Sequence, residues 1–235
     1  FRHFGIDIEE SVERFEEGIS QVRKLLEEEN VTSKGRFHSF SGVTTHPRPT
    51  QLPCPPFYVA VVGTPASFER AGRMGYWIMA IPGVGSDPMA LMQIYRDAWV
   101  EAGHSGKPKL LMAVFMYCHE DRERATYIAK PRVESHFSAI VDAMSEYAVG
   151  TPSKAYKNYD KMREKIAGQT LETQIDSMAA FIGTPDDIES QLRKFEQATG
   201  GCDEVSMQVL YGNMAFEDAE RSVKLFGEEV IPRFQ

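Results

Sequence analysis

The sequence predicts an α/β protein with a parallel sheet, and three observations carry that prediction. Short runs of apolar, β-branched and aromatic residues, typical of strands buried on both faces, occur at residues 57–62, 77–81 and 110–117, and a fourth strand is expected over residues 204–210. Segments with a helical spacing of apolar residues separate these runs, as in repeated strand–helix units. No GxGxxG or GxxxxGK motif follows any run. This disfavours a doubly wound nucleotide-binding fold and favours a (βα) barrel with its chemistry at the carboxyl ends of the strands.

The composition places the chain among globular proteins and excludes several functions. It has 42% hydrophobic and 26% charged residues, and its net charge of −8 provides no global basic field for nucleic acid or anionic lipid. No apolar run approaches the roughly 18 residues of a membrane helix, and no signal peptide is evident, so we expect a cytoplasmic protein. The three cysteines lack metal-ligand spacing and are odd in number, which indicates neither a metal site nor a disulfide framework.

The first quarter of the sequence predicts one helix and one connector. Apolar residues recur at three- and four-residue steps over residues 8–29, and the acidic cluster at 7–10 suits a helix N-terminus. Residues 30–56 contain two glycines and five prolines, too many for a helix or a central strand. We expect an ordered loop or a lid-like connector there, with a short edge strand over residues 36–40.

A tight turn follows the first buried strand. Gly63-Thr64-Pro65 predicts a helix over residues 66–74, with Thr64 at the N-cap and Pro65 at the first helical position. The same turn recurs at 183–185, 120 residues later. The recurrence supports repeated strand–helix units, and it is equally explained by Thr-Pro being a good helix start.

The rest of the chain alternates strands with helices and carries one insertion. A loop over residues 82–85 and a helix over residues 87–102 follow the second strand. A helical insertion is expected from residue 122 to about 148, followed by a mobile polar stretch over residues 150–165. Two helices flank the last strand: one ends at about residue 198, and the other spans residues 216–229.

Two segments around the first turn, PPFYVA at 55–60 and GTPASFERAGRMG at 63–75, resemble the bacterial luciferase-like, flavin-dependent monooxygenase family. Further landmarks occur in the order of that family: RFEEG at 14–18, HPRP at 46–49, FIGTPDD at 181–187 and EEVIPRF at 228–234. The resemblance spans essentially the whole chain. The two segments around the first turn count as one landmark, and with the four others they make five pieces in sequence, which are more specific together than any single piece.

The resemblance implies a (βα)8 TIM-barrel fold. Residues 1–235 would form a single domain, the later portion of such a barrel through its strands five to eight, with a helical and mobile insertion at about 120–178. A complete barrel needs eight strands, whereas four are evident here, so the first strands are expected to be lacking in this chain. The family's catalytic residues would lie before Phe1, and no position here matches them.

The resemblance also implies a flavin site. The FMN phosphate would be bound by Gly63, Thr64 and Ser67, and free N–H groups at a helix N-terminus do suit a phosphate. Plain helix capping by Thr64 is the alternative. Ala80 and Ile81, at the end of the second strand, would line the flavin ring and exclude water. Core packing is the alternative for this pair.

Other conspicuous residues have simpler interpretations. Cys118 and His119 are adjacent in an extended segment, so their side chains point opposite ways and their pairing is incidental. His46 is expected to be a loop residue, and the two tryptophans, Trp77 and Trp99, to be packing residues. Tyr156, Lys157 and Tyr159 fall in the family's mobile lid or simply on a solvated face.

The function implied is an FMN-dependent monooxygenase that oxygenates an organic substrate with O2 and reduced flavin. NAD(P)H would reduce the flavin directly or through a partner reductase, and a homo- or heterodimer is expected. The residues implied here seat the cofactor and do not specify the reaction, so light emission does not follow. Three alternatives stay open: a deazaflavin-dependent dehydrogenase of the same superfamily, a non-catalytic flavin-binding protein, and an inactive fragment that needs a missing N-terminal half.

Overall fold

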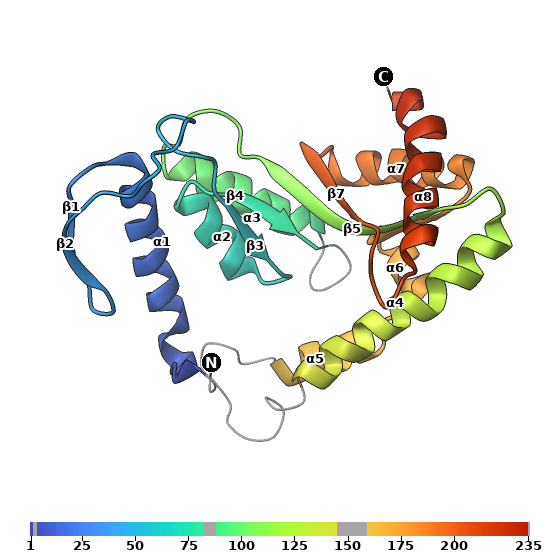
Figure 1. Cartoon of the computed structure of the whole chain (residues 1–235), viewed down its shortest axis with the longest axis horizontal. Helices are drawn as coiled ribbons and strands as arrows, with labels where there is room; N and C mark the ends of the chain where they lie inside the picture. The colour runs from blue at the N-terminus through green and yellow to red at the C-terminus, as the bar shows by residue number, and fades with distance from the viewer. Residues whose placement is uncertain (2–3, 82–87, 145–158, 235) are drawn as a thin grey trace. The chain divides into compact units, whose positions relative to one another are not determined.

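The computed structural model describes residue 1 and residues 4–81, 88–144 and 159–234 (Figure 1). The chain divides into two compact units, one within residues 1–56 and the other built from residues 57–144 and 160–234. None of the described helices is both long enough and apolar enough to cross a membrane. The predicted loop at 82–85 and most of the predicted mobile stretch, with Tyr156 and Lys157, lie outside the described residues.

The first unit contains a helix and a hairpin. A short 3₁₀ turn at Ile8–Glu10 leads into α1 (Ser11–Glu27), which confirms the helix predicted over residues 8–29. Strands β1 (Val31–Lys34) and β2 (Ser39–Val43) pair antiparallel. The prediction of a connector with one strand at 36–40 was therefore wrong over residues 31–43, where two strands form.

The hairpin turn is bound to α1 by a carboxylate. Glu17 of α1 accepts hydrogen bonds from the backbone N–H groups of Arg36, Phe37 and His38, at 2.7 to 3.1 Å. Burial raises the pKa of Glu17, but these three amides outweigh it and hold the pKa below its usual value of 4.5. Gln21 adds a bond to the carbonyl of His38. These contacts reach across about twenty residues, so the local breaker pattern did not reveal the hairpin.

The HPRP segment caps the far end of α1. The Arg48 guanidinium donates to the carbonyls of Leu25, Leu26 and Glu28, at 2.8 to 2.9 Å. The last carbonyls of a helix have no partner within the helix, and a positive charge there also opposes the negative end of the helix dipole. His46 is exposed, as expected of a loop residue.

The second unit is a parallel sheet covered by helices. Its strands are β3 (Tyr58–Val61), β4 (Trp77–Ala80), β5 (Leu110–Cys118), β6 (Ala180–Gly183) and β7 (Glu204–Gln208). They run in the order β3, β4, β5, and β5 pairs in parallel with both β6 and β7 (Figure 1). The predicted α/β fold with a parallel sheet is confirmed, and the sheet of the described residues is open. The fifth strand, β6, lies directly before the second Gly-Thr-Pro turn, where the strand–helix pattern of the sequence resumes.

Seven helices are described in this part of the chain: α2 (Pro65–Arg73), α3 (Pro88–Glu101), α4 (Arg122–Met144), α5 (Tyr159–Ala167), α6 (Leu171–Asp176), α7 (Pro185–Thr199) and α8 (Phe216–Glu229). The insertion after β5 is helical, as predicted, and α8 has the predicted bounds. Helices α2 and α3 pack very closely, because a Cβ on Gly72 would lie only 2.4 Å from the backbone oxygen of Tyr95.

The two faces of the sheet differ. Alternate residues of the strands, such as Ile78, Met112 and Val114, are buried in one apolar core with side chains of α2, α3 and α7. The residues between them face the other way, where Ala60 of β3 and Ser206 of β7 are exposed. The expectation that the strand at 57–62 is buried on both faces was therefore wrong for β3, because no described residues of this unit cover its second face.

Candidate functional site

The predicted flavin-binding residues lie at the carboxyl ends of two neighbouring strands. Val61, the last residue of β3, pairs with Ala80, the last residue of β4. Gly63 and Thr64 follow β3 closely, and Ile81 follows β4. The residues predicted to bind the phosphate and those predicted to line the flavin ring therefore lie at the same edge of the sheet. Gly63 has a φ of 58°, which is the left-handed conformation that glycine adopts without strain. This conformation turns the chain from β3 into α2.

The hydroxyls of Thr64 and Ser67 are not used to cap α2. Thr64 has extended N-cap dihedral angles and Pro65 begins the helix, as predicted, but no side-chain capping bond forms. Instead the Thr64 and Ser67 hydroxyl oxygens lie 2.7 Å apart and share a hydrogen bond. The Ser67 N–H donates to the Thr64 carbonyl at 3.0 Å. Plain capping by the Thr64 side chain, the alternative interpretation, is thus not what this turn shows.

The second Gly-Thr-Pro turn is built differently and supplies an internal comparison. Thr184 caps α7 in a capping box, in which the Asp187 carboxylate accepts from the Thr184 N–H at 3.0 Å and from its hydroxyl at 2.9 Å. Arg122 donates two bonds to the same carboxylate. Arg122 first, and then the Thr184 groups, hold the pKa of Asp187 below its usual value against burial. This turn therefore carries its own anion.

The first turn has the same donors without that anion. Ser67 stands where Asp187 stands in the second turn, so a neutral hydroxyl replaces the carboxylate. Thr64 is exposed and Ser67 is half-buried. The positive end of the α2 dipole and two hydroxyls together suit a phosphate group. The donor set thus fits the phosphate of a flavin nucleotide. The signal was present in the sequence, as Thr-Pro-x-Ser in one turn against Thr-Pro-x-Asp in the other.

The two residues predicted at the end of β4 separate in the structure. Ala80 is only 3% exposed and belongs to the core on the helix side of the sheet. Ile81 is 44% exposed. Because successive residues of a strand face opposite sides, only one of the pair can face a ligand on the open side. Core packing describes Ala80, and Ile81 stays the candidate for contact with a flavin ring.

The opposite end of the sheet is closed by a polar contact. Tyr58 and Glu204, the first residues of β3 and β7, meet through a 2.9 Å hydrogen bond from the phenol to the carboxylate. Burial, followed by this carboxylate, raises the pKa of Tyr58 to about 12. The ring of Tyr58 also packs edge-on against Trp77. These amino-end groups serve packing, which leaves the carboxyl ends as the candidate site.

The Cys118–His119 pair takes no part in a shared site. Cys118 is 1% exposed in the core, where burial raises the pKa of its thiol to about 12. A thiolate nucleophile needs a lowered pKa, so this thiol is inert. The His119 Nδ1 accepts from the Asp121 N–H at 3.0 Å, which is a turn contact.

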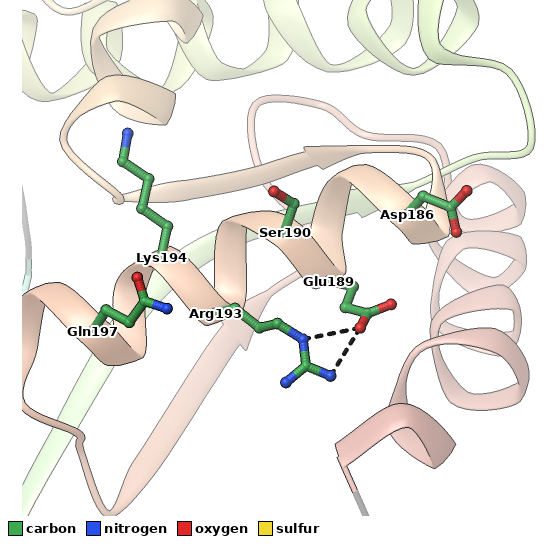
Figure 2. Close-up of a pocket in the computed structure, with 6 residues that line it drawn as sticks. All are labelled: Asp186, Glu189, Ser190, Arg193, Lys194 and Gln197. Carbon is green, nitrogen blue, oxygen red and sulfur yellow. Dashed lines mark hydrogen bonds and ion pairs between the residues drawn. The ribbon is translucent and has the colours of Figure 1, made fainter.

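A shallow hollow of about 400 Å³ lies on the outer side of α7 (Figure 2). It is lined by Asp186, Glu189, Ser190, Arg193, Lys194 and Gln197. Figure 2 shows Arg193 bonded to Glu189, with a nitrogen–oxygen distance of 2.8 Å. Arg233 of the EEVIPRF segment binds Asp186 and Glu189 as well, at 2.7 and 2.9 Å. The surface of α7 around the hollow is therefore covered by ion pairs, and Arg233 binds to it. None of the predicted site residues lines the hollow.

The sequence pattern of the luciferase-like monooxygenase family matches residues 1–201. With this match and the parallel strand–helix architecture, the chain belongs to the luciferase-like monooxygenase family. The family resemblance predicted from five landmarks in the sequence is thereby confirmed.

Three proteins show the range of its relatives. A 5,10-methylenetetrahydromethanopterin reductase of Archaeoglobus fulgidus is 23% identical over 243 residues, which cover all of this chain and 70% of the relative. An F420-dependent glucose-6-phosphate dehydrogenase of Amycolatopsis mediterranei is 23% identical over 231 residues, covering 97% of this chain and 63% of the relative. The crystal structure of the monooxygenase RslO1 from Streptomyces bottropensis matches with a TM-score of 0.73 and 29% identity, over 100% of this chain and 65% of that one. The chain thus spans about two thirds of the length of each protein.

Proposed function

We propose that this chain is the FMN-binding part of a monooxygenase that oxygenates an organic substrate with O2. One observation carries the proposal: at the carboxyl end of β3, the paired hydroxyls of Thr64 and Ser67 lie at a helix N-terminus that no carboxylate caps. Family membership supports flavin-type chemistry, and the likeness to a monooxygenase structure at 29% identity supports oxygenation over dehydrogenation.

Each residue has a defined part in this proposal. Thr64 and Ser67 would donate to the phosphate, and Gly63 allows the backbone to turn beneath it. Ile81 would exclude water beside the ring. FMN reduced by NAD(P)H, directly or through a reductase, would provide the electrons that activate O2. These residues would seat the cofactor, and they assign no catalytic group, substrate or dimer partner.

The test is a titration of FMN with the purified chain, followed by quenching of flavin fluorescence. We expect saturable binding that is weakened about tenfold or more when both hydroxyls are removed in Thr64→Ala, Ser67→Ala. A matched control exists in the β1–β2 hairpin, where the exposed hydroxyls of Thr32 and Ser41 lie 3.3 Å apart. The double variant Thr32→Ala, Ser41→Ala should leave FMN binding unchanged.

Other outcomes separate the alternatives. Tighter binding of the deazaflavin F420 than of FMN would favour a dehydrogenase. The Amycolatopsis relative is named as an F420-dependent dehydrogenase, which supports testing this cofactor. Binding of FMN without oxygen consumption, even when the flavin is reduced and the chain is supplemented with a complete relative's front half, would favour a non-catalytic flavin carrier. Failure of the folded chain to bind FMN would contradict the proposal for the chain as it stands and favour an inactive fragment.

A further inference from the structure

Two buried donors without partners lie where α4 meets the loop after β7. Among the described residues, three buried side-chain nitrogen or oxygen atoms have no hydrogen-bond partner: Arg132 Nε, Arg163 Nε and the Tyr211 hydroxyl. Tyr211 is only 5% exposed. Buried polar atoms almost always find a partner, so two orphaned groups in one neighbourhood call for an acceptor.

The backbone holds Arg132 and Tyr211 close together. Gly212, with a φ of 52°, packs so tightly on α4 that a Cβ would lie 1.8 Å from the Arg132 carbonyl oxygen. The charge of Arg132 also acts on the Tyr211 hydroxyl. Burial and then Tyr117 raise the pKa of Tyr211 above its usual value, and the nearby Arg132 charge opposes part of that rise. One end of the guanidinium is anchored, because its Nη1 donates to the Ile128 carbonyl at 2.8 Å.

The surroundings are aromatic and lie at the ligand end of the sheet. The ring of Phe115 lies 4.8 Å from that of Tyr211 and 5.0 Å from that of His136, and Phe137 adds an edge contact at 5.9 Å. Phe115 pairs with Gln208, the last residue of β7, and Tyr211 follows three residues later. In parallel strand–helix folds the carboxyl ends of the strands carry the ligands.

We propose that Arg132 and Tyr211 bind an oxyanion, a carboxylate or a phenolate, of an aromatic substrate. Arg Nε–H is a donor only and carries a delocalised positive charge, so an anionic oxygen satisfies it better than a water molecule does. The Tyr211 hydroxyl supplies the second donor, and the ring of Phe115, 4.8 Å from that of Tyr211, offers an apolar face to the planar body of the ligand. As a substrate subsite this rests on the proposed function, which leaves the substrate open.

The test uses benzoate as the probe and is run without flavin, so its failure and a failure of the FMN titration are distinguishable. Arginine Nε–H resonances are followed by NMR while benzoate is added through the millimolar range. We expect one Nε–H signal, the one missing in Arg132→Lys, to shift saturably. Benzamide, which has the same shape without the charge, should not shift it.

Variants decide the assignment. Tyr211→Phe removes one oxygen atom, and we expect benzoate binding about tenfold weaker, with a similar loss in Arg132→Lys. Tyr127 and Arg124, on the exposed side of the same helix, give matched controls, and Tyr127→Phe and Arg124→Lys should bind benzoate as the wild type does. No saturable shift in the folded wild type, an equal response to benzamide, or undiminished binding by Tyr211→Phe would each overturn the proposal and leave a bound water as the acceptor.

Discussion

The difference between the two Gly-Thr-Pro turns can be tested by converting one into the other. In the second turn the Asp187 carboxylate accepts from the Thr184 N–H and hydroxyl at 3.0 and 2.9 Å. Ser67→Asp creates the same Thr-Pro-x-Asp pattern in the first turn. A capping box of this kind stabilises by about 0.5–1 kcal/mol when no arginine supports it, which raises the melting temperature by roughly 1–4 °C.

The same change should weaken FMN binding. A carboxylate near 4 Å from a phosphate dianion repels it by about 2 kcal/mol at the dielectric constant of water, or roughly 30-fold in affinity. Thermal unfolding and flavin fluorescence quenching measure the two effects on one sample. Ser67→Asn, which is neutral, should bind FMN far better than Ser67→Asp. Equal affinities for the two variants, or undiminished FMN binding by Ser67→Asp, would refute a phosphate at this turn.

Three further predictions concern the fold. Arg48→Met removes three hydrogen bonds at the end of α1 and should lower the free energy of unfolding by about 2 kcal/mol in urea titrations; a change within experimental error would show that solvent replaces them. The native pKa of Glu17 is lowered, so its contribution to the free energy of unfolding is present above the unfolded pKa of 4.5 and is lost as the pH falls through the native pKa. Glu17→Gln should therefore be less stable than the wild type at neutral pH. Unfolding followed by circular dichroism should show this difference in stability shrinking below pH 4.5. Gly72→Ala places a Cβ 2.4 Å from the backbone oxygen of Tyr95 and should lower the free energy of unfolding by about 1–3 kcal/mol. Gly18→Ala, in α1, meets nothing within 4 Å and should raise it by up to about 1 kcal/mol. Equal effects of the two variants would contradict the packing described for α2 and α3.

The elements that could be predicted from the sequence are those with local signals. Helices α1 and α8 have apolar residues at helical spacing, and β5 is one unbroken apolar run. The hairpin of β1 and β2 could not be predicted, because its turn depends on a carboxylate about twenty residues away on α1. The local sequence there shows only breakers and short polar segments.

The candidate site was predictable in place but not in detail. The family resemblance located Gly63, Thr64 and Ser67, and the structure adds that their hydroxyls pair with each other instead of capping the helix. Strand alternation could have separated Ala80 from Ile81 had the covered face been known. Arg132 and Tyr211 carried no signal, because they are 79 residues apart and only tertiary packing brings α4 to the loop after β7.

The central claim is that the turn from β3 into α2 holds the phosphate of FMN, and comparison of FMN with riboflavin tests it most directly. Riboflavin has the same ring system without the phosphate. The wild type should bind FMN at least about tenfold more tightly than riboflavin, and Thr64→Ala, Ser67→Ala should bring that ratio close to one while riboflavin binding stays unchanged. Equal affinities of the wild type for the two flavins, or an unchanged ratio in the variant, would contradict the account.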